Sequence, residues 1–125
     1  MPGASSRSVL IIEDNADAAD SLADFLRLGC GFKVATARDG LTGLRMAVAD
    51  PPDAVVCDLG LPRRNGLLVA EELADTLPTK PLLIAVTGYA DQVPEELARD
   101  AGFDHYLVKP ADPFAVAALI ESLGR

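Results

Sequence analysis

The sequence predicts an α/β fold, a doubly wound parallel sheet with helices on both faces. Five short apolar runs alternate with five segments whose apolar residues recur at helical spacing. A strand that is followed by a helix five times in succession requires parallel strands with right-handed crossovers. Half of the 125 residues are hydrophobic, which is enough for one domain with a real core. The predicted strands are Ser8–Ile12, Phe32–Thr36, Asp53–Asp58, Leu82–Val86 and Asp104–Val108.

The ends of the helices can be recognised from capping residues. Asn15, Asp39 and Asp112 are predicted N-caps, and the third helix should begin at Asn65 or Gly66. The fourth helix is predicted over Asp91–Ala101, with Pro94 in its first turn. The predicted helix ends are Gly29, Pro51, Gly102 and Gly124.

Each helix should turn one apolar stripe toward the sheet. The residues expected to face inward are Ala18, Leu22, Phe25 and Leu26, then Leu41, Leu44 and Val48, then Ala70, Leu73 and Leu77, and finally Val116, Leu119, Ile120 and Leu123.

Composition excludes several classes of protein. A net charge of −8 argues against direct, non-specific nucleic-acid binding, which needs a basic face. No apolar run of about 18 residues is present, so no membrane span is expected. Cys30 and Cys57 lack CxxC spacing and are predicted to be buried thiols of a cytoplasmic protein. Residues 1–7 lack the apolar core of a signal peptide and are expected to be a disordered leader before a domain over 8–124.

The run Ala54–Asp58 organises the rest of the chain. It reads as a buried strand that ends in an aspartate and enters a loop with Gly, Pro and Asn. In an open parallel sheet, ligands bind at the carboxyl ends of the strands. The Asp58 carboxylate should therefore point into a site.

Other polar residues follow the neighbouring strands. Glu13 and Asp14 end the first strand, Thr87 ends the fourth and Lys109 ends the fifth. Each of these residues alone fits an ordinary strand end or turn; their joint placement indicates a site. Converging carboxylates favour a hard divalent cation such as Mg²⁺, and a lysine and a hydroxyl beside them can hold an anion. This set suits phosphoryl transfer, with the carboxylate as nucleophile.

These motifs resemble those of a response-regulator receiver domain. The acidic pair Glu13-Asp14, Asp58, Thr87 and the pair Lys109-Pro110 match the family pattern in place and order, and the similarity extends from Ser8 to Gly124. The resemblance implies a flavodoxin-like sheet in the strand order 2-1-3-4-5.

The resemblance also implies roles for single residues. Asp58 would accept a phosphoryl group, and Mg²⁺ would be held by Asp14, Asp58, the carbonyl of Gly60 and, through water, Glu13. Lys109 and Thr87, with Gly88 beside it, would contact the phosphate. Pro110 would follow a cis peptide bond, and Tyr106 would be the aromatic switch residue.

The family further implies partners. The donor would be a sensor histidine kinase or a histidine phosphotransfer protein. A downstream protein would bind through the fourth helix, fifth strand and fifth helix, and a phosphorylation-dependent dimer is a further option. The domain would be a signalling module and not an enzyme in its own right. It would show weak self-catalysed phosphorylation and dephosphorylation. The segment Gly102–Pro110 also resembles receivers of hybrid sensor kinases.

The loop after Asp58 departs from the family pattern. Arg64 stands where a methionine is usual, Asn65 stands where an aspartate is frequent, and Arg63 adds a second cation. These differences bear on the rate of phosphorylation and not on the fold.

Three other functions compete with this interpretation. A magnesium-dependent phosphatase with an aspartyl nucleophile needs an acid two residues after the nucleophile, where this chain has Gly60. A flavin carrier needs a phosphate loop after the first strand, where Glu13 and Asp14 would repel phosphate. A degenerate receiver used only for docking would not need the complete set of site residues.

His105 is expected to be a non-catalytic residue of an edge strand.

Overall fold

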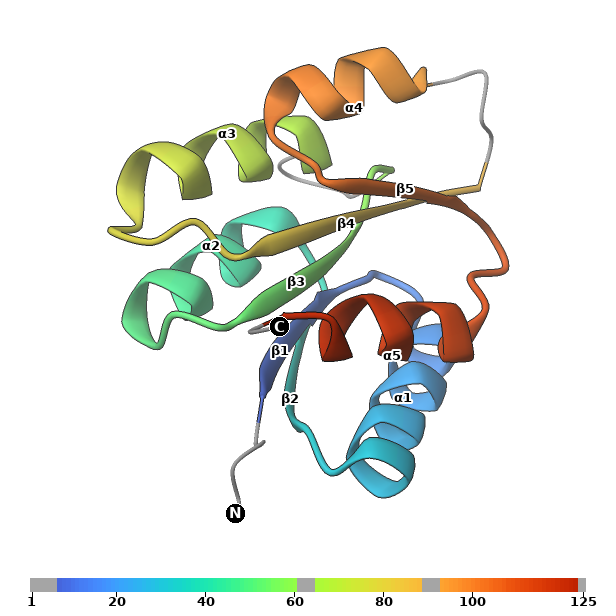
Figure 1. Cartoon of the computed structure of the whole chain (residues 1–125). Helices are drawn as coiled ribbons and strands as arrows, with labels where there is room; N and C mark the ends of the chain where they lie inside the picture. Colours follow the sequence, from blue (N-terminus) through green and yellow to red (C-terminus); the bar gives the residue numbers. More distant parts are fainter. Residues whose placement is uncertain (1–6, 61–64, 89–92, 124–125) are drawn as a thin grey trace.

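The computed structural model describes residues 7–60, 65–88 and 93–123 and shows the expected α/β architecture (Figure 1). Five parallel strands form one sheet in the order β2-β1-β3-β4-β5, which confirms the predicted topology. The strands are β1 (Ser8–Ile12), β2 (Lys33–Ala37), β3 (Ala54–Asp58), β4 (Leu82–Thr87) and β5 (His105–Val108).

The helices cover both faces of the sheet. The helical segments are α1 (Ala16–Asp24), its π-helical continuation η2 (Phe25–Gly29), α2 (Gly40–Ala49), α3 (Gly66–Thr76), α4 (Glu95–Ala101) and α5 (Pro113–Glu121). One apolar cluster joins the sheet to α2, α3 and α4, and a second joins its other face to α1, η2 and α5. Among the described residues, no helix is long and apolar enough to cross a membrane.

Capping contacts explain where four helices begin. The side chains of Asn15, Asp39, Asn65 and Asp112 each accept a hydrogen bond from a backbone N–H of the first helical turn, at 2.8–3.1 Å. The predicted N-caps are therefore confirmed. Gly102 ends α4 with φ of 119°, a left-handed conformation that favours glycine.

The fourth helix is shorter than expected. It begins at Glu95, with Pro94 as its N-cap residue in an extended conformation; the expected start at Asp91 lies outside the described residues, as does the expected stop at Gly124. Strand boundaries differ from the expectation by one residue at several ends. β2, for example, runs over Lys33–Ala37, because Ala37 pairs with Ile12 while Phe32 turns into the core.

The prediction of which residues face inward is partly wrong for two helices. Ala18 is exposed and Val48 is 46% exposed, whereas Ala19, Ala23 and Ala47 are buried with Gly43. For α2 the reason is a short distance between helix and sheet: a Cβ atom on Gly43 would lie 2.5 Å from Cδ1 of Ile12. Small residues therefore line the contact, and the larger Val48 is turned away.

The two cysteines differ in environment. Cys57 is fully buried in β3, as expected, but Cys30 is only partly buried, which corrects the expectation of two buried thiols. Burial raises the pKa of both thiols above their usual value. Neither thiol is therefore a good nucleophile near neutral pH.

Gly66 is the position at which the close approach of β3 and α3 can be tested. A Cβ atom there would lie 3.0 Å from the Asp58 carbonyl oxygen and 3.0 Å from Cα of Leu59, both backbone atoms. Gly66→Ala should therefore lower the free energy of unfolding by about 1–3 kcal/mol, measured by urea denaturation.

Gly29→Ala is the matched control. A Cβ atom there finds only the Phe25 ring at 3.9 Å, so this substitution should leave stability unchanged or raise it by about 0.4–1 kcal/mol. Equal destabilisation by both substitutions would contradict the packing described for Gly66.

Candidate functional site

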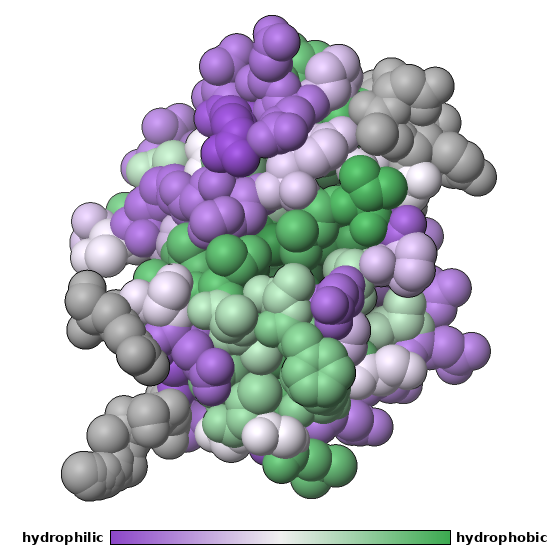
Figure 2. Space-filling view, turned by 45° about the vertical axis from the view of Figure 1, so that its right-hand side comes forward, coloured by the Kyte–Doolittle hydropathy of each residue, from purple (hydrophilic) through white to green (hydrophobic). Residues whose placement is uncertain are grey.

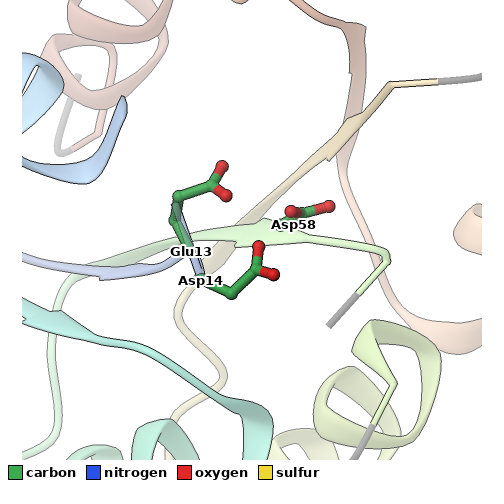
Figure 3. Close-up of side chains that lie close together, drawn as sticks. All are labelled: Glu13, Asp14 and Asp58. Carbon is green, nitrogen blue, oxygen red and sulfur yellow. The ribbon is translucent and has the colours of Figure 1, made fainter. Parts of the chain in front are cut away.

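Adjacent strands bring three carboxylates to one edge of the sheet. β1 and β3 pair with Ile12 opposite Cys57, so Glu13 and Asp58 follow at the same level. Figure 3 shows Glu13, Asp14 and Asp58 gathered there, and one oxygen from each lies within 4.8 Å of the others. Glu13 and Asp58 are buried, whereas Asp14 is exposed.

The Asp58 carboxylate is fixed on both sides. Its Oδ1 accepts a hydrogen bond from the Gly60 N–H at 2.9 Å, and its Oδ2 accepts one from Lys109 Nζ at 2.9 Å. The first contact is a local turn that follows from the aspartate at the strand end. The second joins the end of β3 to the segment after β5.

Lys109 bridges two of the acids. Its Nζ lies 3.1 Å from Glu13 Oε1 and 2.9 Å from Asp58 Oδ2, and its backbone N–H donates to the Thr87 carbonyl at 2.7 Å. Burial lowers the pKa of Lys109, but the hydrogen bonds to Asp58 and Glu13 outweigh burial and leave this pKa raised. The ammonium therefore remains charged. The peptide bond between Lys109 and Pro110 is cis.

Negative charge exceeds positive charge among the side chains of this cluster. Burial raises the pKa of Glu13, while hydrogen bonds from the Asn15 N–H and from Lys109 oppose this shift. Three carboxylates face a single ammonium within the described residues. A set of hard oxygen donors with surplus negative charge fits a hard divalent cation such as Mg²⁺.

Thr87, the last residue of β4, and Gly88 after it lie at the same edge of the sheet as the acids. Thr87 ends β4 and is 4% exposed, and the pairing of Asp58 with Val86 places Thr87 next to Asp58. A Cβ atom on Gly88 would lie 3.9 Å from Cδ of Lys109, so this residue borders the lysine stem. The hydroxyl, the ammonium and the carboxylates thus come from β4, the segment after β5, and the ends of β1 and β3.

Tyr106 belongs to a separate contact. Its ring is half-buried against the apolar cluster on the α2–α4 face, and its hydroxyl donates to the Val93 carbonyl at 2.5 Å. This bond ties β5 to the chain that enters α4. His105, its neighbour, is partly exposed on the same edge strand.

A cavity that the sequence did not reveal adjoins the site. It has a volume of about 540 Å³, and its lining includes Asp58 and Lys109 together with Ala18, Leu22 and Ala111. The signal in the sequence is weak, since small residues such as Ala18 of α1 and Ala111, which precedes α5, open space only when the fold brings the two segments together. Arg63 and Arg64 lie outside the described residues.

The chain is similar to known signalling proteins along almost its whole length. It is 39% identical over 119 residues to the transcriptional regulatory protein PrrA of Mycobacterium tuberculosis, covering 94% of this chain and 48% of PrrA. It is 37% identical over 113 residues to the response regulator MprA of Mycobacterium ulcerans, covering 90% of this chain and 46% of MprA. The chain thus spans about half the length of the curated relatives it matches.

A solved structure shows similarity to the same kind of protein. A response regulator protein from Burkholderia pseudomallei, solved with a phosphorylated aspartic acid, calcium ion and citrate, superposes with a TM-score of 0.83 at 30% identity, covering 93% of this chain and 67% of that one. Residues 9–121 match the family described as the response regulator receiver domain. The chain therefore belongs to the response regulator receiver domain family.

Proposed function

We propose that this chain receives a phosphoryl group on Asp58 from the histidine of a sensor kinase or of a histidine phosphotransfer protein. The observation that carries the proposal is the Asp58 carboxylate, held between the Gly60 N–H and Lys109 in a cluster of acids. The Burkholderia relative with a phosphorylated aspartic acid supports it.

The chemistry is a displacement at phosphorus. An oxygen of the Asp58 carboxylate forms a bond to the phosphorus of phosphohistidine, the P–N bond breaks, and its electron pair returns to the imidazole nitrogen. In this reaction the protein mainly positions groups and neutralises charge. Lys109 supplies a point charge beside the carboxylate, and Thr87 and Gly88, at the end of the neighbouring strand β4, would contact the new phosphate.

A divalent cation completes the charge balance. Glu13, Asp14, Asp58 and the carbonyl of Gly60 are the groups that would hold it, and their oxygen chemistry fits Mg²⁺. When bound, Mg²⁺ neutralises the charge of the phosphoryl oxygens. The competing assignment as a phosphatase gains no support, because Gly60 offers no side chain that could act as a general acid.

Phosphorylation would act on a protein-binding surface. Phosphate on Asp58 would give the Thr87 hydroxyl a new acceptor, and the movement of Thr87 would alter the packing of Tyr106. The bond from Tyr106 to the Val93 carbonyl lies between β5 and the start of α4, so its change would reach the surface of α4, β5 and α5. We propose a downstream protein as the partner of this surface in the cytoplasm, and no direct contact with nucleic acid, in view of the net charge of −8.

Asp58→Asn tests the acceptor. The parent protein, incubated with Mg²⁺ and acetyl phosphate, should gain the mass of one phosphoryl group, whereas Asp58→Asn should gain none because its amide is not a nucleophile. Intact-protein mass spectrometry measures the difference, and a chelator should suppress the gain in the parent.

Asp75→Asn is the control, since this aspartate is exposed on α3 and lies outside the cluster. It should gain mass as the parent does. A phosphoryl group that still appears on folded Asp58→Asn would exclude Asp58 as the acceptor.

Thr87→Ala tests the switch. This variant should still accept phosphate, because the carboxylate and Lys109 remain, but it should lose most of the response at Arg99 and Tyr106 because the hydroxyl contact is missing. Amide shifts recorded with and without beryllofluoride, a phosphoryl mimic, measure the response. A full response at these residues in Thr87→Ala would show that the hydroxyl is not the trigger.

A further inference from the structure

The cavity beside the site has the size and the walls of a small-molecule pocket. Three adjacent strands contribute buried apolar side chains to it: Ile11 of β1, Val56 of β3 and Val86 of β4. Its volume of about 540 Å³ lies within the range of roughly 300–1,000 Å³ that is typical of small-molecule sites. Because these strand side chains cannot form hydrogen bonds, this part of the wall favours an apolar ligand.

The cavity can be reached from solvent. Ala18 and Ser21 of α1 and Pro110 after β5 belong to its wall and are exposed. Pro113, the first residue of α5, also lines it, and Figure 2 shows hydrophobic residues over a broad area of the side that carries this helix. The apolar character of the cavity thus continues toward α5.

The cavity also has a polar part, in which negative charge is in excess. Among the described residues, its ionisable lining groups are Glu13, Asp58 and Lys109, which are two carboxylates and one ammonium. The ammonium already contacts both carboxylates, at 3.1 and 2.9 Å. An anionic head group would compete with them for Lys109, whereas the carboxylates keep lone pairs that can accept from a further donor. The polar part therefore favours a cationic head group.

We propose that this cavity binds a small amphipathic amine, with its primary ammonium against Glu13 and Asp58 and its apolar body between α1 and the segment that leads from β5 into α5. Such an amine is protonated near neutral pH, as a lysine side chain is. Its ammonium forms charge-assisted hydrogen bonds to the two carboxylates. Its body buries apolar surface against the side chains of the three strands.

An occupied cavity would hinder the reaction proposed above, because the ammonium lies against the carboxylate of Asp58 that would form the new bond. This consequence rests on the proposed function, whereas the binding itself does not. Binding is therefore measured without Mg²⁺ and without a phosphoryl donor. A negative result in the phosphorylation assay and a negative result in the binding assay are then separate outcomes.

Tryptamine is the probe, because the chain contains no tryptophan and the indole fluorescence comes from the ligand alone. Titrating the protein into tryptamine should shift the emission to shorter wavelength, with a dissociation constant of about 1 mM or below. Tryptophol and indole-3-acetate carry the same ring with a neutral and an anionic head group. Tryptophol should bind at least about fivefold more weakly than tryptamine, and indole-3-acetate more weakly again.

Ala18→Leu tests the place of the apolar body. It should weaken tryptamine binding at least about fivefold, because the larger side chain takes up part of the cavity. Ala74→Leu is the matched control: this alanine is also exposed on a helix, but it lies on α3 outside the cavity, so the variant should bind as the parent does.

Glu13→Gln tests the place of the ammonium. The charges of the remaining lining groups then cancel, so tryptamine should be preferred over tryptophol by no more than about twofold. Thermal unfolding verifies that this variant and the two leucine variants are folded. A Glu13→Gln variant that keeps the full preference of the parent would overturn the assigned head-group position.

Amide shifts locate the ligand. Tryptamine should shift Ala18, Leu22 and Ala111, which line the cavity. Shifts confined to Lys33 and Met46 would overturn the proposal, because these residues line a second cavity of about 350 Å³ near the beginnings of β1 and β2. Equal affinity for the three indole compounds, no saturable binding at millimolar protein, or an Ala18→Leu variant that binds as tightly as the parent would overturn it as well.

Discussion

The contact of the Lys109 ammonium with both Glu13 and Asp58 is the interaction on which the site depends. Two carboxylates buried side by side repel one another and lose hydration. A cation that forms hydrogen bonds to both carboxylates reduces the free-energy cost of the repulsion and of the lost hydration. The sheet topology makes this possible, because β1 and β3 are neighbours and the backbone bond from Lys109 to Thr87 fixes the lysine beside them. The remaining surplus of negative charge is what a divalent cation can neutralise.

Local chemistry made most of the fold predictable. Strand periodicity and the capping residues Asn15, Asp39 and Asp112 depend only on nearby sequence, and the structure confirms them. The rotation of the helices was less predictable. Val48 belongs to an apolar stripe in the sequence, yet it is turned outward because Gly43 lets α2 approach Ile12 closely. That distance is a property of the packed domain and cannot be read from spacing along one helix.

The site shows the same division between local and tertiary information. The sequence placed the candidate residues at strand ends, and a parallel sheet necessarily gathers such residues at one edge. It could not reveal which acids Lys109 contacts, that the Tyr106 hydroxyl is bonded to Val93, or that a cavity opens between α1 and the segment that leads from β5 into α5. The charge-free stretch of α5 is visible in the sequence, but its pattern alone does not distinguish a buried helix from one whose outer side is exposed.

Thermal unfolding of matched variants with and without Mg²⁺, at constant ionic strength, tests the charge balance of the site most directly. Millimolar Mg²⁺ should raise the Tm of the parent, because a cation bound to the folded state relieves repulsion among its carboxylates. Asp14→Asn should lose most of this gain, whereas Asp17→Asn, which removes an exposed acid of α1 outside the cluster, should keep it. A parent whose Tm does not respond to millimolar Mg²⁺, or an Asp14→Asn variant that gains as much as the parent, would contradict the assignment of Glu13, Asp14 and Asp58 as one cation site.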